Sequence, residues 1–163
     1  MTASSQLEDM VNEAVELRFS SEGLPAGQVT PAMAQEVLLD TRKRLDRVEE
    51  LLVRVLRLRG RAKQISESRK HEVADAWSKA LNDIANSPQR KTGYDYSSAK
   101  ERYSEADLSV IDLRMKEREA TEFADQTQTA YDVIRTCHRG LDTLRGDCVA
   151  YLRSLQFESS LER

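Results

Sequence analysis

A seven-residue repeat of apolar and small side chains is the feature that most constrains the fold of this chain. Its positions over residues 99–155 are Ala99, Ala106, Leu113, Ala120, Thr127, Ile134, Leu141, Cys148 and Leu155. The companion positions are partly apolar and include Tyr103, Val110, Ala124, Tyr131 and Leu152. Two such positions per heptad form the a/d seam of a coiled coil. The repeat therefore predicts an all-α fold built on a long helix, and it disfavours a compact domain around a catalytic pocket.

The composition is consistent with an elongated helical protein. Of the 163 residues, 39% are hydrophobic, 33% are charged and 6% are aromatic, which is little apolar material for a globular core. No apolar run reaches the roughly 18 residues that a membrane-spanning helix requires. The N-terminus lacks the basic and apolar regions of a signal peptide. We expect a cytoplasmic protein without a membrane partner.

Capping signals divide the chain into two parts. Residues 1–30 are predicted to form a short helix and a loop, and residues 31–163 are predicted to form a long helical hairpin. Ser5 and Glu8 match a capping box, in which each side chain bonds the backbone N–H of the other residue. They predict a first helix over about residues 6–19. A loop rich in glycine and proline follows this helix.

The hairpin is predicted to consist of two long helices joined by a polar turn. Thr30 and Pro31 provide an N-cap and the proline that is favoured at the first helical position. The helix that follows runs to a turn at about residues 87–97, and Ser98 with Glu101 forms a capping box for the last helix. Because the two helices have nearly equal lengths and a short connection, we expect them to be antiparallel.

The hairpin seam is narrow and contains polar side chains that are poorly suited to the core of a coiled coil. Glu117, His138 and Arg145 occupy companion positions of the heptad. A single hairpin of this composition buries little apolar surface, so we expect a homo-oligomer that covers the remaining stripes. The candidate interface residues near the C-terminus are Leu152, Leu155 and Phe157.

The sequence contains no motif for catalysis, a cofactor or a metal ion. It has no glycine-rich nucleotide loop, no cluster of His and Cys at metal-ligand spacing and no nucleophile elbow. Cys137 and Cys148 share one helix face, but they are roughly 16 Å apart, too far for a disulfide. We expect both to be reduced core thiols and the protein not to be an enzyme.

Positive charge is concentrated in one segment. Residues 42–71 hold eleven Lys and Arg residues and four acidic residues, although the whole chain has a formal net charge of −3. On a helix, five of these cations lie within about 80° of one another around the helix axis and some 130° from the apolar stripe. Lys79, further along the chain, lies on the same side of the helix. We call this set the basic ridge: Lys43, Arg47, Arg54, Arg57, Arg61 and Lys79.

Two interpretations of the basic ridge remain open. An exposed line of cations is suited to a phosphate backbone. Alternatively, antiparallel pairing would set residues 52–67 opposite roughly residues 117–132, and salt bridges there would fix the helix register. The acidic residues of that segment are Glu117, Glu119, Glu122, Asp125 and Asp132.

The turn carries a second candidate for nucleic-acid contact. Arg90 and Lys91 are followed by Tyr94 and Tyr96, and this mixture of charge and aromatic rings holds single strands by ion pairing and base stacking. Turn tyrosines also pack on helix ends. Trp77 is predicted to belong to the core.

The layout resembles the UvsY family of phage recombination mediators, small helical-hairpin proteins that assemble into rings. The matching segments are RYSE at 102–105, CHRGLD at 137–142 and YLRSLQFE at 151–158. The resemblance implies binding of single-stranded DNA, destabilisation of the single-strand-binding protein on it, and help in loading a RecA-like recombinase.

By position, the basic residues that this family places on the helix entering the turn correspond to Lys79 and, more loosely, to Arg69 and Lys70. The richest basic stretch lies earlier in this chain, and the first 30 residues have no counterpart in the family. The alternative function is a coiled-coil adaptor or structural assembly protein that binds no nucleic acid.

Overall fold

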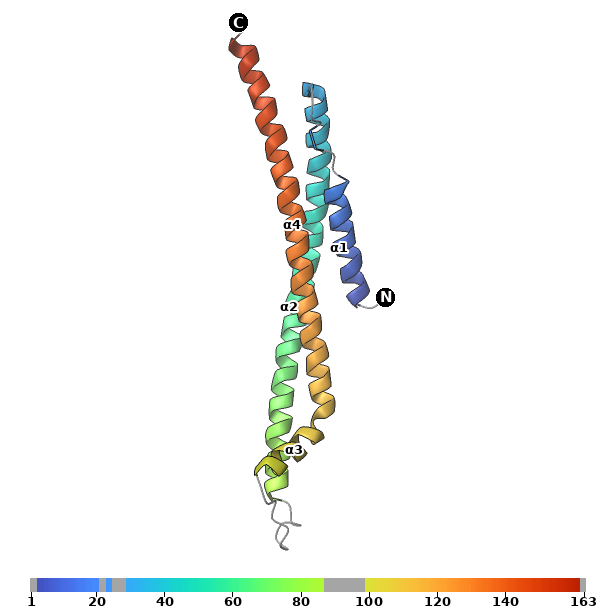
Figure 1. Ribbon diagram of the computed structural model, residues 1–163, viewed down its shortest axis with the longest axis vertical. Coiled ribbons are helices and arrows are strands. Elements are labelled where there is room, and N and C mark those ends of the chain that lie inside the picture. The colour runs from blue at the N-terminus through green and yellow to red at the C-terminus, as the bar shows by residue number, and fades with distance from the viewer. Residues whose placement is uncertain (1–2, 21–22, 25–28, 87–98, 162–163) are drawn as a thin grey trace. The chain divides into compact units, whose positions relative to one another are not determined.

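The computed structural model describes residues 3–20, 23–24, 29–86 and 99–161, and these residues form helices and short connections without a strand. The helices are α1 (Ala3–Phe19), α2 (Pro31–Asn86), α3 (Ala99–Ser109) and α4 (Ile111–Leu161) (Figure 1). They form two compact units, to which α2 and α4 both contribute. The first unit consists of residues 1–59 and 126–163, and the second consists of residues 60–125. The predicted all-α fold is confirmed.

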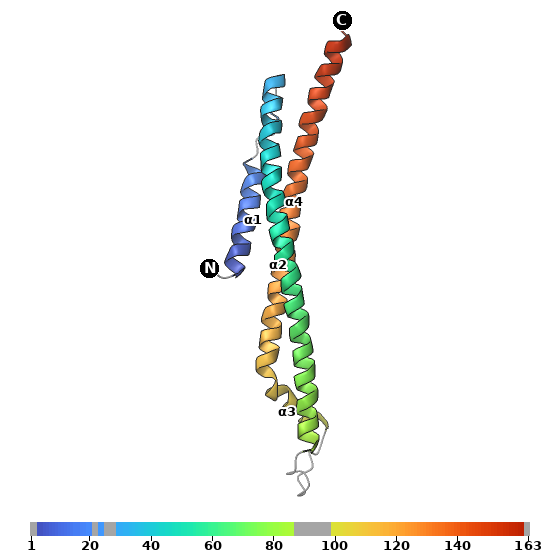
Figure 2. The same cartoon turned by 180° about the vertical axis from the view of Figure 1, so that it is seen from behind.

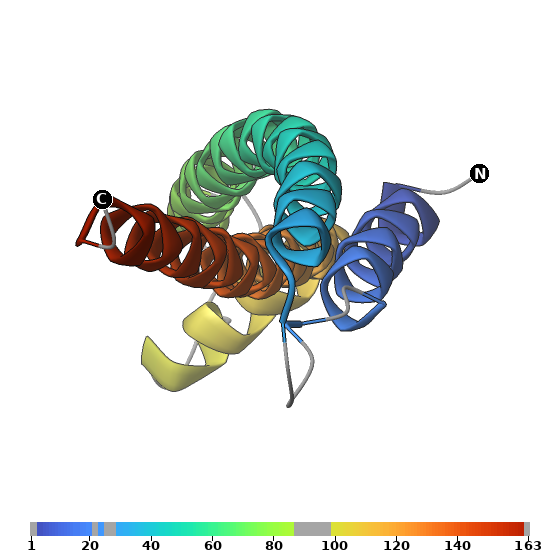
Figure 3. The ribbon, with the colours of Figure 1, turned by 90° about the horizontal axis from the view of Figure 1, so that it is seen from above.

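In the first unit, α1 lies beside the first part of α2 (Figure 2). It also contacts the middle of α4, where Ser4 bonds Gln126 and Arg18 lies against Gly140. The α2 and α4 segments are antiparallel, since Glu49 meets His138 and Arg59 lies over the ring of Tyr131. Seen from above, α1 lies beside α2 (Figure 3). The side chains that this unit buries completely include Thr41, Val48, Leu51, Val55, Thr127, Ile134, Leu141 and Cys148.

The heptad pattern locates this core correctly. Thr127, Ile134, Leu141 and Cys148 recur every seven residues, and all are 0% exposed. Leu155, the next position, is half-buried. A repeat of seven residues keeps one face of a helix directed at its neighbour, and here that face meets α1 as well as α2.

The second unit pairs the last part of α2 with α3 and the first part of α4. The Ser66 and Thr121 hydroxyl groups are 3.1 Å apart, and the rings of Trp77 and Tyr103 are stacked with centroids 5.6 Å apart. These contacts show antiparallel packing within this unit as well. The buried side chains here include small ones such as Ala62 on α2 and Ala106, a heptad position, on α3.

The prediction of one continuous last helix after the Ser98 cap is wrong, because the chain breaks at Val110. Ser109 Oγ donates a hydrogen bond to the Ala106 carbonyl at 2.7 Å, and a serine side chain bonded to its own helix backbone favours a bend. The Val110 N–H donates to the Asp107 carbonyl at 3.2 Å. Val110 is buried while Ile111 is 51% exposed. Side-chain periodicity does not register such a local change of backbone direction.

The capping predictions have different outcomes. Thr30 Oγ1 accepts a hydrogen bond from the Met33 N–H at 3.3 Å, so the predicted start of α2 is confirmed. The capping box at Ser5 is wrong, because α1 begins at Ala3 and Ser5 lies inside the helix. Ser4 there donates a hydrogen bond to Gln126 at 3.0 Å. The predicted turn at 87–97 and the Ser98 cap lie outside the described residues.

Candidate nucleic-acid interface

The basic ridge of the first unit divides into exposed and paired cations. Lys43, Arg54 and Arg57 are exposed on α2. Arg47 is half-buried and donates hydrogen bonds to Glu13 of α1 at 2.5 Å and to Glu50 at 2.7 Å. These bonds, the one to Glu13 first, raise the pKa of the Arg47 guanidinium above its ordinary value. Arg47 therefore stabilises the packing of α1 against α2.

The basic residues of the second unit divide in the same way. Arg61 and Lys79 are exposed on α2. Arg69 pairs with Glu72 at 2.5 Å and Lys70 pairs with Glu67 at 3.3 Å, each three residues away on the same helix. Exposed pairs of this kind contribute little to stability and exchange readily for another anion.

Two acidic residues of α4 have partners on their own helix and do not neutralise the exposed arginines. Glu122 pairs with Arg118 one turn away at 3.0 Å, and Asp132 accepts a hydrogen bond from Gln128 at 2.8 Å. Within the part of the chain that the structure describes, Arg54, Arg57 and Arg61 form no ion pair. A polar contact that does join α4 to α2 is between His138 Nε2 and Glu49 Oε1, at 3.2 Å.

The second unit also contains an aromatic pair that the heptad pattern did not predict. The rings of Trp77 and Tyr103 are parallel within 9°. Trp77 is half-buried, so it is only partly the core residue predicted, and Tyr103 is 51% exposed. The buried Trp77 Nε1 has no hydrogen-bond partner among the described atoms. The companion position of Tyr103 in the heptad repeat predicted that its ring would lie near α2, but it did not predict the stacking on Trp77.

Other predicted sites have simpler outcomes. Arg90, Lys91, Tyr94 and Tyr96 lie outside the described residues. Leu152 and Leu155 are half-buried, and Phe157 is 65% exposed. An apolar ring of this exposure at the end of α4 leaves surface that a second chain can cover.

The cysteines are core thiols, as predicted. Cys137 and Cys148 are free and are 6% and 0% exposed. Burial raises the pKa of both thiols, which disfavours the reactive thiolate. Among the residues that the structure describes, no group of three or more His, Cys, Asp or Glu side chains is placed to hold a metal ion.

None of the described helices is long and apolar enough to cross a membrane. None of the protein-family models, curated proteins and solved structures compared with the chain matches it.

Proposed function

We propose that this protein binds single-stranded DNA through the exposed cations of α2. We further propose that it acts as an oligomeric recombination mediator, which helps load a RecA-like recombinase onto DNA covered by single-strand-binding protein. The DNA-binding part is supported by the side chains of α2. The mediator part is supported by the resemblance to the UvsY family.

The observation that carries the proposal is the state of Arg54, Arg57 and Arg61. All are exposed, and none has an ion-pair partner among the described residues. A guanidinium group that is not engaged by a carboxylate presents its full set of donors to a phosphate. Arg47, bonded to Glu13, provides the contrast, because its charge is used within the fold.

Tyr103 adds a ring that suits single strands. Its stacking on Trp77 holds the ring in a fixed orientation while about half of the side chain remains exposed. Bases of a single strand stack on such rings whatever their sequence, at about 1–3 kcal/mol per base. Duplex bases are already stacked, so we expect weaker binding of duplex.

The test is the salt dependence of binding to an oligo-dT strand. Each neutralised phosphate contributes about −0.7 to the slope of log affinity against log salt for a single strand, so four to six contacts predict about −3 to −4. Replacing Arg54, Arg57 and Arg61 with Gln should reduce the magnitude of the slope by about 2. Thermal stability should hardly change, because exposed positions contribute within about 0.5 kcal/mol.

A matched control removes the same charge from α4. Arg114, Lys116 and Arg118 are exposed, but Arg114 pairs with Asp107 and Arg118 pairs with Glu122. The variant with Gln at these positions should keep the slope of the natural protein, because two of the three cations already have carboxylate partners. Equal slopes for both triple variants, or no binding at low salt, would contradict the proposal.

The alternative function, a coiled-coil adaptor, is favoured by a different observation. Val53 and Leu56 on α2 are 47% and 44% exposed, and Ile65 is 53% exposed. Such side chains provide a surface for another helix. Light scattering should show a mass several times 18.6 kDa if copies of the chain cover them. A monomer that binds no DNA but captures a helical partner would favour the adaptor.

A further inference from the structure

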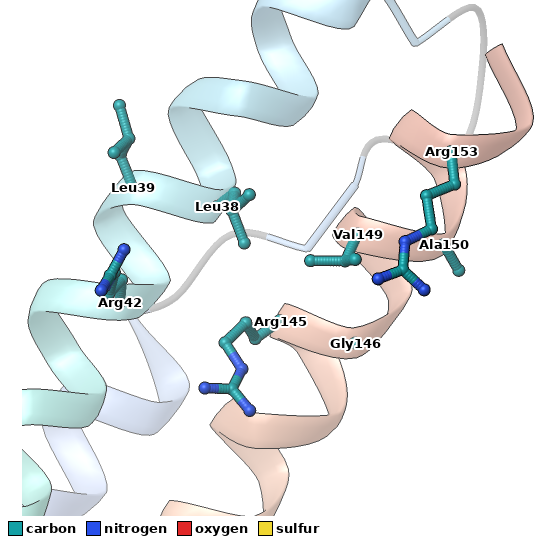
Figure 4. A pocket seen from close by; sticks show the side chains of 8 residues that line it. All are labelled: Leu38, Leu39, Arg42, Arg145, Gly146, Val149, Ala150 and Arg153. Carbon is teal, nitrogen blue, oxygen red and sulfur yellow. The ribbon is translucent and has the colours of Figure 1, made fainter. Parts of the chain in front are cut away.

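A groove in the first unit lies between the beginning of α2 and the last part of α4, and it has a volume of about 640 Å³ (Figure 4). Aliphatic side chains from both helices form its apolar surface, and arginines from both helices surround it. These residues are Leu38, Leu39, Val149, Arg42, Arg145 and Arg153.

The groove has an excess of positive charge. Arg145 pairs with Asp142 at 2.6 Å. Arg42 and Arg153 are exposed and have no ion pair among the residues described. Two guanidinium groups beside an apolar surface are therefore available to carboxylates from outside the chain.

The apolar part of the groove is open. Leu39 is 61% exposed. A Cβ atom added at Gly146, which lines the groove, would meet no atom within 4 Å. The volume is within the range of about 300–1,000 Å³ that is typical of ligand sites.

We propose that this groove binds an acidic amphipathic segment of a partner protein, an interaction separate from DNA binding. Carboxylates of that segment would pair with Arg42 and Arg153 in the fork geometry that arginine favours, and its aliphatic side chains would cover Leu39 and Val149. An amphipathic helix in a groove is a common form of peptide recognition. Charge complementarity requires the segment to be acidic.

The groove residues favour a peptide over a nucleic acid. None of the described residues that line the groove is aromatic, whereas sites for single strands combine cations with rings on which bases stack. A phosphate backbone would leave the leucine and valine side chains exposed. An acidic peptide with leucines on one face would pair with the arginines and also cover the aliphatic side chains of the groove.

The probe is a fluorescent synthetic peptide of about 14 residues, or four helical turns, with leucines on one face and glutamates beside them. Its matched control has Gln for every Glu. The acidic peptide should bind the full-length protein, and the Gln peptide should bind at least about tenfold more weakly, because a neutral amide cannot form the charge-assisted pair. Replacing Arg42 and Arg153 with Gln should produce a similar loss for the acidic peptide.

A second variant tests the groove without altering charge. Gly146→Leu places a side chain in the open space and should weaken peptide binding about tenfold or more, while helix propensity rises. Gly60→Leu is the matched control, because a Cβ there also meets nothing within 4 Å and Gly60 does not line the groove. It should bind the peptide normally.

Several results would overturn the proposal. They include no binding of the acidic peptide, equal binding of the two peptides, and normal binding by Gly146→Leu. A loss of oligo-dT binding by the Arg42 and Arg153 variant with unchanged peptide binding would assign these arginines to DNA. A fall in oligomer mass for Gly146→Leu would make the groove an interface between copies of the chain.

Discussion

The two units use the same two helices but bury very different side chains. The first unit completely buries Leu51, Ile134 and Leu141. The buried residues of the second unit are smaller, namely Ala62, Ser66, Val73, Ala106 and Val110, while Ile65 and Met115 are more than half exposed. Both units contain a third helix, but α1 in the first unit has 17 residues and α3 in the second unit has only 11, so less helix covers the α2–α4 seam there.

Specific polar contacts hold α1 in place. Arg44 of α2 donates to the Leu17 carbonyl at 3.1 Å, which satisfies an unpaired acceptor at the end of α1 and places a cation where the helix dipole favours one. Arg47 holds Glu13. Arg18 crosses Gly140 so closely that an added Cβ would lie 2.3 Å from Nε. The first unit therefore combines apolar burial with contacts that select one position for α1.

The largest expected difference between the units comes from core truncation. Leu51→Ala should lower the free energy of unfolding by about 2–5 kcal/mol, because it removes transfer free energy and leaves a cavity. Val73→Ala, which removes less volume from the second unit, should cost about 1–2 kcal/mol. Urea unfolding gives both values.

The chain has built-in probes for each unit. Trp77, the only tryptophan, reports on the second unit through its fluorescence, and labelling of Cys137 and Cys148 reports on opening of the first. We expect the fluorescence transition at a lower urea concentration than the loss of thiol protection. Coincident transitions would show one cooperative molecule and would remove the distinction between the units.

Buried hydroxyl groups should give effects of opposite sign. Thr41 in the first unit is 0% exposed, and its Oγ1 has no partner among the described atoms. Thr41→Val keeps the shape and should raise the unfolding free energy by about 1 kcal/mol. Ser66 in the second unit shares a hydrogen bond with Thr121, so Ser66→Ala should lower it by about 1 kcal/mol. A loss of stability in Thr41→Val would show that its hydroxyl is satisfied.

The smallest expected effects are at two helical glycines. Gly60→Ala in the second unit meets no atom within 4 Å, so it should raise the unfolding free energy by about 0.5–1 kcal/mol through helix propensity alone. Gly140→Ala in the first unit must displace the end of the Arg18 side chain and should gain less. Thermal unfolding compares the two variants. An equal gain at both sites would mean that the Arg18 contact contributes nothing.

The start of α2 could be predicted from the sequence, because Thr30 and Pro31 act on the backbone within one turn. The break at Val110 and the position of Tyr103 could not. The position of the Tyr103 ring depends on Trp77, which is distant in the chain, and the break at Val110 coincides with hydrogen bonds of Ser109 and Val110 that side-chain periodicity does not predict. For the candidate site, helical phase predicted the exposure of Arg54, Arg57 and Arg61 correctly. The same calculation placed Arg47 beside them, although a carboxylate of α1 holds it.

The sequence by itself determined that this chain is helical. It also determined which face of α4 is buried around Ile134 and Leu141, because a seven-residue apolar repeat places these side chains on one face, whichever apolar neighbour covers it. Only the tertiary structure decided which neighbour that is. It brought α1 onto the first unit, left the second unit with small buried side chains, and opened the groove beside Gly146. These features depend on contacts between residues far apart in the sequence, and periodicity carries no information about such contacts.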